Sequence, residues 1–324
     1  MSARSGRERL AAYALTLFAF SALMACAERK DSRPSSDRRD GGVAVDLREV
    51  SRSGRLADRD IDESSGLTPS SSDSLLFWTH NDSGNDARLY AIDSTGKSLG
   101  SVRVRGATNS DWEGIASGPC PEGQCLYIAD VGDNSAKRPL VVLWRVLEPR
   151  PRDVNSATAV RLAFRYPDGP QDVEAIYVSP DTSVWLLSKR PLRSGSGELR
   201  PVRVYRIPAS AWSGGSAPGS GPVTAELVDS LPIVPEREDS RSWVTDAALS
   251  PARADGSRRL AVLTYGAIHV FRADPVTGRP GLLYARCALT IREKYAEAIA
   301  WLPDGRLLFS NEGKGAGVYT GRCP

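Results

Sequence analysis

The chain has 324 residues, and its 42 Lys or Arg and 39 Asp or Glu residues give a formal net charge of +3. This near-balance gives no reason to expect a nucleic-acid-binding protein, and a hydrophobic content of 41% excludes an intrinsically disordered chain. Only two histidines are present, which argues against His-rich zinc chemistry, whereas 29 glycines and 22 prolines indicate a turn-rich globular protein.

The first 25 residues have the features of a secretion signal. Three arginines precede an apolar stretch, Leu10–Leu23, which is too short to span a bilayer comfortably. This stretch leads into Leu-Met-Ala-Cys, ending at Cys26, and that sequence resembles the lipobox of bacterial lipoproteins. The alternative is an ordinary signal peptide followed by a chance cysteine.

The lipobox resemblance implies that residues 1–25 are removed and that Cys26 is acylated as the new N-terminus. We therefore expect a protein held to a lipid bilayer of the cell envelope through Cys26. If the host is Gram-negative, Ala27 after the cysteine favours the outer membrane. Residues 26–40 are polar, have no apolar periodicity and are predicted to form a flexible tether.

Four cysteines remain besides Cys26, an even number that suits disulfides in an oxidising compartment. Cys120 and Cys125 bracket a Pro-Glu-Gly-Gln segment that suits a disulfide across a tight turn, and Cys287 would then pair with Cys323. Three connectivities are possible, and the sequence alone does not choose among them. No CxxC or Cys/His spacing suggests zinc.

Beyond residue 40 the chain repeats itself. An acidic residue followed by small and apolar residues occurs five times, at spacings of 50, 61, 72 and 51 residues. These acids are Glu63, Glu113, Glu174, Asp246 and Glu297. Strand-like runs, rich in aromatic and branched residues, follow each acid. The second runs are 75–84, 125–134, 184–190, 260–267 and 307–315; the third are 89–93, 141–146, 202–207, 268–271 and 317–321; the fourth are 101–106, 159–167, 223–232 and 282–291.

A period of about 50 residues with several strands per unit predicts an all-β fold, a single β-propeller over residues 41–324. We count five blades. A sixth, irregular blade inside the 72-residue spacing is the alternative, although residues 214–221 are more simply a loop, and two unrelated β domains are a further alternative. The fifth unit has no fourth strand of its own, so we expect Val43–Val50 to complete it and close the ring.

The predicted fold brings polar residues to one end of the ring. The first strand of each propeller blade lines the channel, and its start meets the loops that join the second and third strands, so the five acids should converge around one mouth. The other residues predicted at this mouth are His80, Asn81, Asp82, Asp111, Asp130, Asp133, Asn134, Asp172, Lys189, Tyr265, Asn311 and Glu312.

Carboxylates this close together cannot all ionise without cost, so some must be protonated, pair with cations or bind a metal. A donor set made of oxygens alone favours Ca²⁺, which takes six to eight oxygen ligands. The alternatives are that the acids cap strand starts and are neutralised by nearby basic residues, or that they are protonated.

Catalytic motifs are weak. The sequence has no G-x-S-x-G elbow, and no histidine can be assigned as a partner to Ser64 or Ser65, which argues against a serine triad. His80 is the candidate general base, with a plain hydrogen-bonding role as the alternative. His269 lies within a strand run and is expected to be structural.

Two stretches resemble known propeller families. The segments ESSGL, THNDSG and LYAID, followed by DWEGIA and LYIADVGDN, resemble bacterial propeller proteins of the SdiA-regulated and esterase-like phytase type. The likeness covers residues 60–150 well and the later units more loosely.

A more distant resemblance is to the calcium-holding propeller lactonases of the gluconolactonase and paraoxonase types, which use Glu, Asn and Asp around a channel metal. It adds Asp133 and Asn134 to the five ring acids as expected Ca²⁺ ligands, whereas the scarcity of histidine departs from lactonases that use paired histidines as a base.

The sequence therefore predicts a membrane-anchored, secreted β-propeller whose acidic mouth holds a cation and binds a small-molecule or protein ligand. A Ca²⁺-dependent hydrolase of phosphoesters or lactones is the alternative, and a structural scaffold of the cell envelope is a second alternative.

Overall fold

The computed structural model describes residues 43–189, 199–214, 221–233, 240–289 and 296–324. The predicted signal peptide, Cys26, the tether and most of the predicted loop at 214–221 lie outside the described residues. In the described part, every element is a β-strand except two single turns, α1 (Ala211–Gly214) and the 3₁₀ turn Ser240–Ser242. None of its helices has the length and apolar character needed to cross a membrane.

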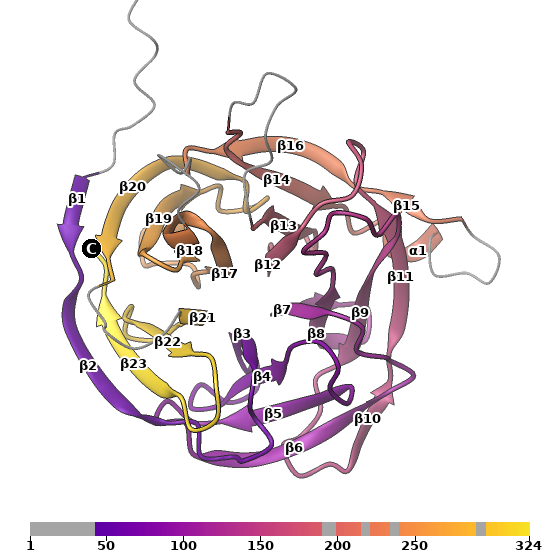
Figure 1. Cartoon of the computed structure of the whole chain (residues 1–324), viewed down its shortest axis with the longest axis horizontal. Coiled ribbons are helices and arrows are strands. Elements are labelled where there is room, and N and C mark those ends of the chain that lie inside the picture. The colour runs from indigo at the N-terminus through magenta and orange to yellow at the C-terminus, as the bar shows by residue number, and fades with distance from the viewer. Residues whose placement is uncertain (1–42, 190–198, 215–220, 234–239, 290–295) are drawn as a thin grey trace, which may run out of the picture. The chain divides into compact units, whose positions relative to one another are not determined.

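Five antiparallel sheets, here called blades 1 to 5, stand around a ring (Figure 1). Blade 1 contains β3 (Ser64–Pro69), β4 (Phe77–Asn81), β5 (Arg88–Ile92) and β6 (Ser98–Arg105). Blade 2 contains β7 (Trp112–Cys120), β8 (Gly123–Asp130), β9 (Val141–Leu147) and β11 (Val160–Arg165). Blade 3 contains β12 (Val173–Val178), β13 (Val184–Ser188), β14 (Val202–Ile207) and β16 (Glu226–Leu231). Blade 4 contains β17 (Val244–Leu249), β18 (Arg258–Thr264), β19 (Ala267–Ala273) and β20 (Pro280–Ala288). Blade 5 contains β21 (Ala296–Trp301), β22 (Leu307–Asn311), β23 (Gly317–Arg322) and β2 (Arg48–Arg55). The predicted five-bladed propeller is confirmed.

The hydrophobic core lies between the blades. Each of five clusters of buried side chains draws its members from two neighbouring blades, so every sheet is covered on both faces. Trp78 of blade 1 and Trp112 of blade 2 share one such cluster, and both side chains are fully buried. Burial of one large side chain contributes about 1.5–3 kcal/mol, and this explains why the inner strands read as continuous apolar runs.

An N-terminal strand closes the ring, as expected, but not with the predicted bounds. Residues Arg48–Arg55 form β2, which pairs antiparallel with β23 and completes blade 5. The preceding strand, β1 (Val43–Asp46), instead pairs parallel with β20 of blade 4. The predicted strand Val43–Val50 is therefore divided between two blades.

The same arrangement recurs around the ring. β10 (Asn155–Thr158) precedes β11 but pairs parallel with β6 of blade 1, and β15 (Val223–Thr224) precedes β16 but pairs parallel with β11 of blade 2. The predicted fourth strand 223–232 is thus divided in the same way. Each of these short strands fastens the outer edge of one blade to the next and shortens the open edge.

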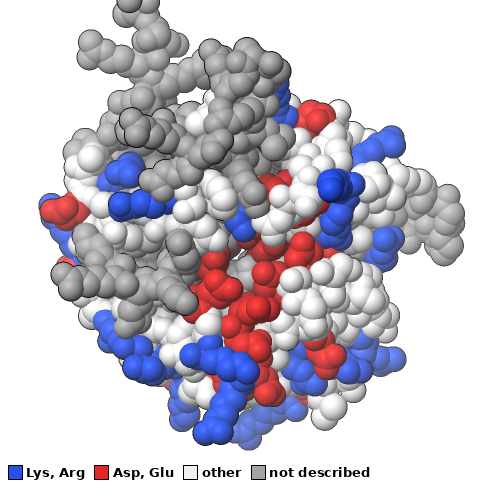
Figure 2. Space-filling view, in the orientation of Figure 1, with Lys and Arg blue, Asp and Glu red and all other residues white. Residues whose placement is uncertain are grey.

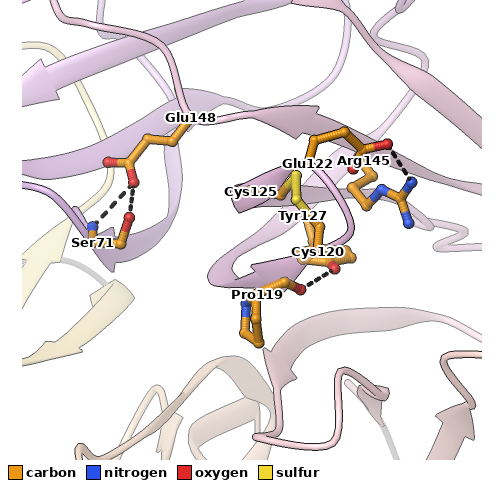
Figure 3. The surroundings of a disulfide bond; sticks show 8 residues. All are labelled: Ser71, Pro119, Cys120, Glu122, Cys125, Tyr127, Arg145 and Glu148. Atoms are coloured by element: carbon orange, nitrogen blue, oxygen red, sulfur yellow. Dashed lines mark hydrogen bonds and ion pairs between the residues drawn. A yellow bond between two sulfur atoms is a disulfide. The ribbon is translucent and has the colours of Figure 1, made fainter.

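The two disulfides have the pairing first considered from the sequence. Cys120–Cys125 closes the turn between β7 and β8, next to Tyr127, whose hydroxyl donates to the Pro119 carbonyl at 2.7 Å (Figure 3). Cys287–Cys323 joins β20 of blade 4 to the end of the chain after β23. This second bond holds the two blades that meet at the N-terminal strands.

Candidate functional site: the acidic mouth

Each innermost strand contains a β-bulge near its start. The residues left unpaired by the five bulges are Gly66, Glu113, Glu174, Thr245 and Glu297. A bulge inserts one extra residue and re-aims its side chain, so the fold presents these five positions in equivalent places around the channel. Three of them are glutamates, and all three are buried.

The bulges show that two predicted ring acids are not equivalent to the others. Glu63 precedes the bulge of blade 1 by three residues and lies exposed before β3. Asp246 follows the bulge of blade 4 by one residue and is fully buried. In these two blades the repeat was aligned on an acid that is not the bulged residue, because a bulge leaves no simple mark in the residue pattern.

Asp246 ties inner strands together across the channel. Its carboxylate accepts hydrogen bonds from the amides of Ala247 and Ile299, both at 2.8 Å, and of Leu67 at 3.2 Å. These amides belong to β17, β21 and β3, so one side chain joins three blades. Burial raises the pKa of Asp246 well above its ordinary value, against the lowering effect of the amides.

Glu113 and Glu174 form a coupled pair next to one ammonium group. Lys189 Nζ donates to Glu174 Oε1 at 2.6 Å, and Glu174 in turn accepts a hydrogen bond from Glu113. Burial raises the pKa of Glu174 to about 7 although Lys189 lowers it. Burial, and next the charge of Glu174, raise the pKa of Glu113 well above its ordinary value. The pair therefore favours retention of a proton on Glu113.

Glu297 is held by a neighbouring tyrosine. Tyr265 Oη donates to Glu297 Oε1 at 2.8 Å. Burial, together with the charge of Glu174, raises the pKa of Glu297 well above its ordinary value. Burial and the adjacent carboxylate likewise raise the pKa of Tyr265, so the phenol stays protonated.

Three carboxyl groups at the mouth have the geometry of a cation site. Asp82, Asp111 and Glu113 each offer one oxygen, and these oxygens lie within 4.8 Å of one another. Burial is the main cause that raises the pKa of Asp82 to about 6, and it also raises the pKa of Asp111. Oxygens about 2.4 Å from a shared Ca²⁺ can be at most about 4.8 Å apart, so the group fits that ion in size and in donor type.

Gly132 makes this close approach possible. A Cβ atom at Gly132 would lie 2.3 Å from Glu113 Oε1 and 2.6 Å from Asp111 Oδ2. Any side chain there would push the carboxylates apart, so only glycine fits behind them. The sequence analysis did not single out Gly132, although its place between the mouth acids Asp130 and Asp133 was a usable signal.

Several predicted mouth residues hold the loops and do not face the channel. Asp130 accepts from the amides of Ser110 and Asp111, both at 3.2 Å, and from Arg138 Nη2 at 2.7 Å. Arg138 was not recognised in the sequence. Its charge lowers the pKa of Asp111, so it acts against the burial that raises it.

Asp133 and Asp172 belong to the same loop network. Asp133 accepts from the Arg138 amide at 2.5 Å, while its own amide donates to Asp172 Oδ1 at 3.3 Å. Asn134, expected from the lactonase resemblance to bind calcium with Asp133, is exposed. Asp133 is not a member of the three-carboxylate group.

Asn81 and His80 support blade 1 from behind the mouth. Asn81 Oδ1 accepts from the Asp62 and Glu63 amides at 3.2 and 3.3 Å. The His80 ring is fully buried, with its Nδ1 3.0 Å from the Asn81 carbonyl oxygen and its edge against Trp112. Burial lowers the pKa of His80 to about 4, so this residue is neutral and enclosed.

The remaining two predicted mouth residues lie at the end of β22. Asn311 is buried and Glu312 is exposed. Figure 2 shows the resulting surface: acidic side chains gather at the centre of the ring, and basic ones lie around the rim.

Comparisons with known proteins give little beyond the fold. No protein-family model matches the chain, and no curated protein matches it. Among solved structures it is similar to a glucose dehydrogenase (TM-score 0.46, 11% identity, covering 84% of this chain and 98% of that one). It is also similar to a gluconolactonase of Xanthomonas campestris (TM-score 0.40, 15% identity, 90% of each chain) and to the Dos1 propeller (TM-score 0.36, 14% identity, 77% of this chain). The chain spans 53% of the Dos1 chain. At these TM-scores the likenesses carry no conclusion about activity.

Proposed function

We propose that the mouth of the propeller binds Ca²⁺ through Asp82, Asp111 and Glu113, and that the bound ion receives an oxygen-bearing ligand, either a small molecule or a group on a protein partner. The observation that carries this proposal is the set of three carboxylate oxygens within 4.8 Å of one another. Three protein oxygens leave most of the six to eight calcium positions to water or ligand.

The raised pKa values support a cation site. Burial raises the pKa of Asp82, Asp111 and Glu113 because it disfavours their charged forms, and a divalent cation would stabilise those charged forms. Lys189 supplies one positive charge, and it is engaged with Glu174. Glu174 is therefore proposed to orient Glu113 and not to bind the ion itself.

We extend the proposal to the cell envelope. The lipobox resemblance at Cys26 supports a lipid anchor, and the two disulfides are consistent with an oxidising compartment. The described ring would then be exposed outside the cytoplasm, joined to the membrane by residues 27–42.

Thermal melting with and without calcium tests the site. Calcium at 100 times its dissociation constant should stabilise the wild-type protein by about 2.7 kcal/mol, which corresponds to a rise in Tm of about 5 °C for a domain of this size. Glu113→Gln should remove at least half of this rise and cost little without calcium, because burial raises the pKa of Glu113 and already disfavours its charged form. Glu312→Gln, which neutralises an exposed acid of the next loop, is the matched control and should keep the full rise. A Tm independent of calcium in the wild type would contradict the proposal.

One observation favours a hydrolase of lactones or phosphoesters as a second candidate. Glu174 has a pKa of about 7 and contacts the proposed ligand Glu113. A carboxyl group with this pKa can accept a proton from an attacking water at neutral pH, and calcium, when bound, would polarise the substrate oxygen. Turnover of a lactone or phosphoester panel that is lost in Glu174→Gln, while the calcium-induced rise in Tm persists, would support catalysis. A structural scaffold predicts neither turnover nor a calcium effect.

A further inference from the structure

A second charged site lies at the opposite end of blade 4. The turn between β18 and β19 is at the mouth, where Tyr265 contacts Glu297, so the start of β18 and the end of β19 lie at the far end of the blade. A cleft of about 730 Å³ opens there. Its charged and aromatic lining consists of Arg253, Arg258, Arg259, Arg272, Asp255 and Tyr284.

The sheet brings two of these arginines face to face. Arg259 on β18 is the direct cross-strand neighbour of Arg272 on β19. Both guanidinium groups lie over the Tyr284 ring, at 4.1 and 5.7 Å from its centroid. The ring offsets part of the repulsion between the like charges and fixes both guanidinium groups beside the cleft.

Most of the positive charge of this lining is not neutralised by the described residues, although the charge of Arg253 contributes to lowering the pKa of Asp255. Arg258 donates to the Ser250 carbonyl oxygen at 2.8 Å. In the part of the chain that the structure describes, the guanidinium groups of Arg253, Arg259 and Arg272 have no hydrogen bond and no ion pair. Asp255 is the single acidic residue of the lining, and its Oδ1 accepts from the amide and hydroxyl of Ser257 at 2.9 and 2.6 Å.

We propose that this cleft binds a phosphate group. Guanidinium groups present paired N–H donors that match phosphate oxygens in geometry and charge, and a dianionic phosphate would neutralise the facing Arg259 and Arg272. The site is independent of the proposed calcium site, which lies at the other end of the ring and carries the opposite charge.

The position of β1 bears on where the phosphate comes from. Val43, the first described residue, pairs with Ala285, the residue after Tyr284, so the described chain begins beside the cleft. A chain anchored at Cys26 would hold this edge of blade 4 within tether reach of phosphate headgroups at the membrane surface. The same chemistry would accept a soluble phosphate ester, and the two sources are separated by experiment.

The test uses the full-length chain carrying Cys26→Ser, so that no acyl chain contributes to binding, and includes a chelator so that calcium does not bridge phosphate to the mouth. One arm titrates inorganic pyrophosphate by calorimetry. The other measures co-sedimentation with vesicles of phosphatidylcholine alone or with phosphatidylglycerol. We expect Arg259→Gln with Arg272→Gln to weaken binding at least tenfold. Arg105→Gln with Arg161→Gln is the control, because it removes the same charge and Arg161 also lies near an aromatic ring, that of Trp144.

Tyr284 supplies a second set of variants. Tyr284→Phe keeps the ring and should bind like the wild type, whereas Tyr284→Leu frees both guanidinium groups and should weaken binding several-fold. If the wild type binds anionic vesicles but not pyrophosphate, and the variants weaken this binding as expected, the phosphate source is a lipid headgroup. If it binds pyrophosphate but not the vesicles, the source is a soluble ester.

Failure of the wild type to bind either probe would overturn the proposal without reference to any variant. Equal loss of phosphate binding in the two double-arginine variants would also overturn the proposal, because binding would then depend on the overall positive charge of the protein and not on this cleft. Glu113→Gln should leave phosphate binding unchanged, so failure of the proposed calcium site would not imply failure of the proposed phosphate site.

Discussion

Without calcium, the stability of this protein should fall as the pH rises above neutrality. Glu113 and Glu297 have pKa values raised well above the ordinary one, mainly by burial. Each therefore holds its proton more tightly in the folded than in the unfolded chain. The stabilisation from such a group is complete below its unfolded pKa and is lost as the pH rises through its folded pKa.

The size of the effect follows from proton linkage. Each carboxyl that is protonated only in the folded state lowers the free energy of unfolding by about 1.4 kcal/mol per pH unit. Over 1.5 pH units, for example from pH 7.5 to 9, a group that keeps its proton in the folded state costs about 2 kcal/mol, or about 4 °C in Tm for a domain of this size.

The pH range of the measurement must lie where neither histidine changes its protonation. Burial lowers the pKa of His80 to about 4 and that of His269 to about 3, so both are neutral when folded but protonated when unfolded at low pH. Their contribution raises stability as the pH rises to about 7.5, one unit above the unfolded pKa of histidine, and is opposite in sign to that of the carboxyls. Above about pH 7.5 the histidines are neutral in both states, and the carboxyls decide the slope.

The assay is calorimetric melting between pH 7.5 and 9 in a chelator, repeated with calcium. Glu297→Gln should make the decline shallower by about 1.4 kcal/mol per pH unit, and calcium should suppress the part that belongs to Glu113. A Tm that stays level or rises over this range in the chelated wild type would refute the assignment of raised pKa values to these groups.

Three other predictions concern the ring, the site and the anchor. Deletion of residues 48–55 should abolish folding to a monomeric ring, because it leaves β23 as an open edge, whereas deletion of 27–40 should leave the Tm unchanged; equal Tm values for both truncations would refute the closure. Gly132→Ala should remove most of the calcium-induced rise in Tm, because its Cβ displaces the carboxylates; a full rise in this variant would place the ion elsewhere. Cys26→Ser should abolish fatty-acid labelling of the chain in cells, and labelling that persists would show that the anchor is at another residue.

The fold was predictable because its signals are local and repeated. Apolar runs bounded by turn residues recur in five units, and in the described residues these runs form strands of the expected blades, except that the run 223–232 is divided between blades 2 and 3. The even number of cysteines and the short spacing of Cys120 and Cys125 suggested the pairing that the structure has. These features depend on neighbours in the chain, so a sequence displays them directly.

The site was only partly predictable. Glu113, Glu174 and Glu297 occupy equivalent positions on three inner strands, since in these three blades the acid itself is the bulged residue. Asp82 and Asp111 were expected at the mouth but not as partners of Glu113 in one oxygen cluster. Their proximity depends on Gly132 and Arg138, which come from a loop whose path the residue pattern does not specify.

The sequence by itself determined the all-β class and the identity of most strands, and it favoured five blades over six, because apolar periodicity and turn residues act over a few neighbouring positions. Only the tertiary structure decided which acids face one another. Because Asp246 follows the bulge of blade 4, its carboxylate binds amides of three blades. Ring closure divides the N-terminal segment between β1 and β2. Both outcomes depend on which strands of distant blades lie together, and such long-range packing sets the register of a bulge and the partner of an edge strand.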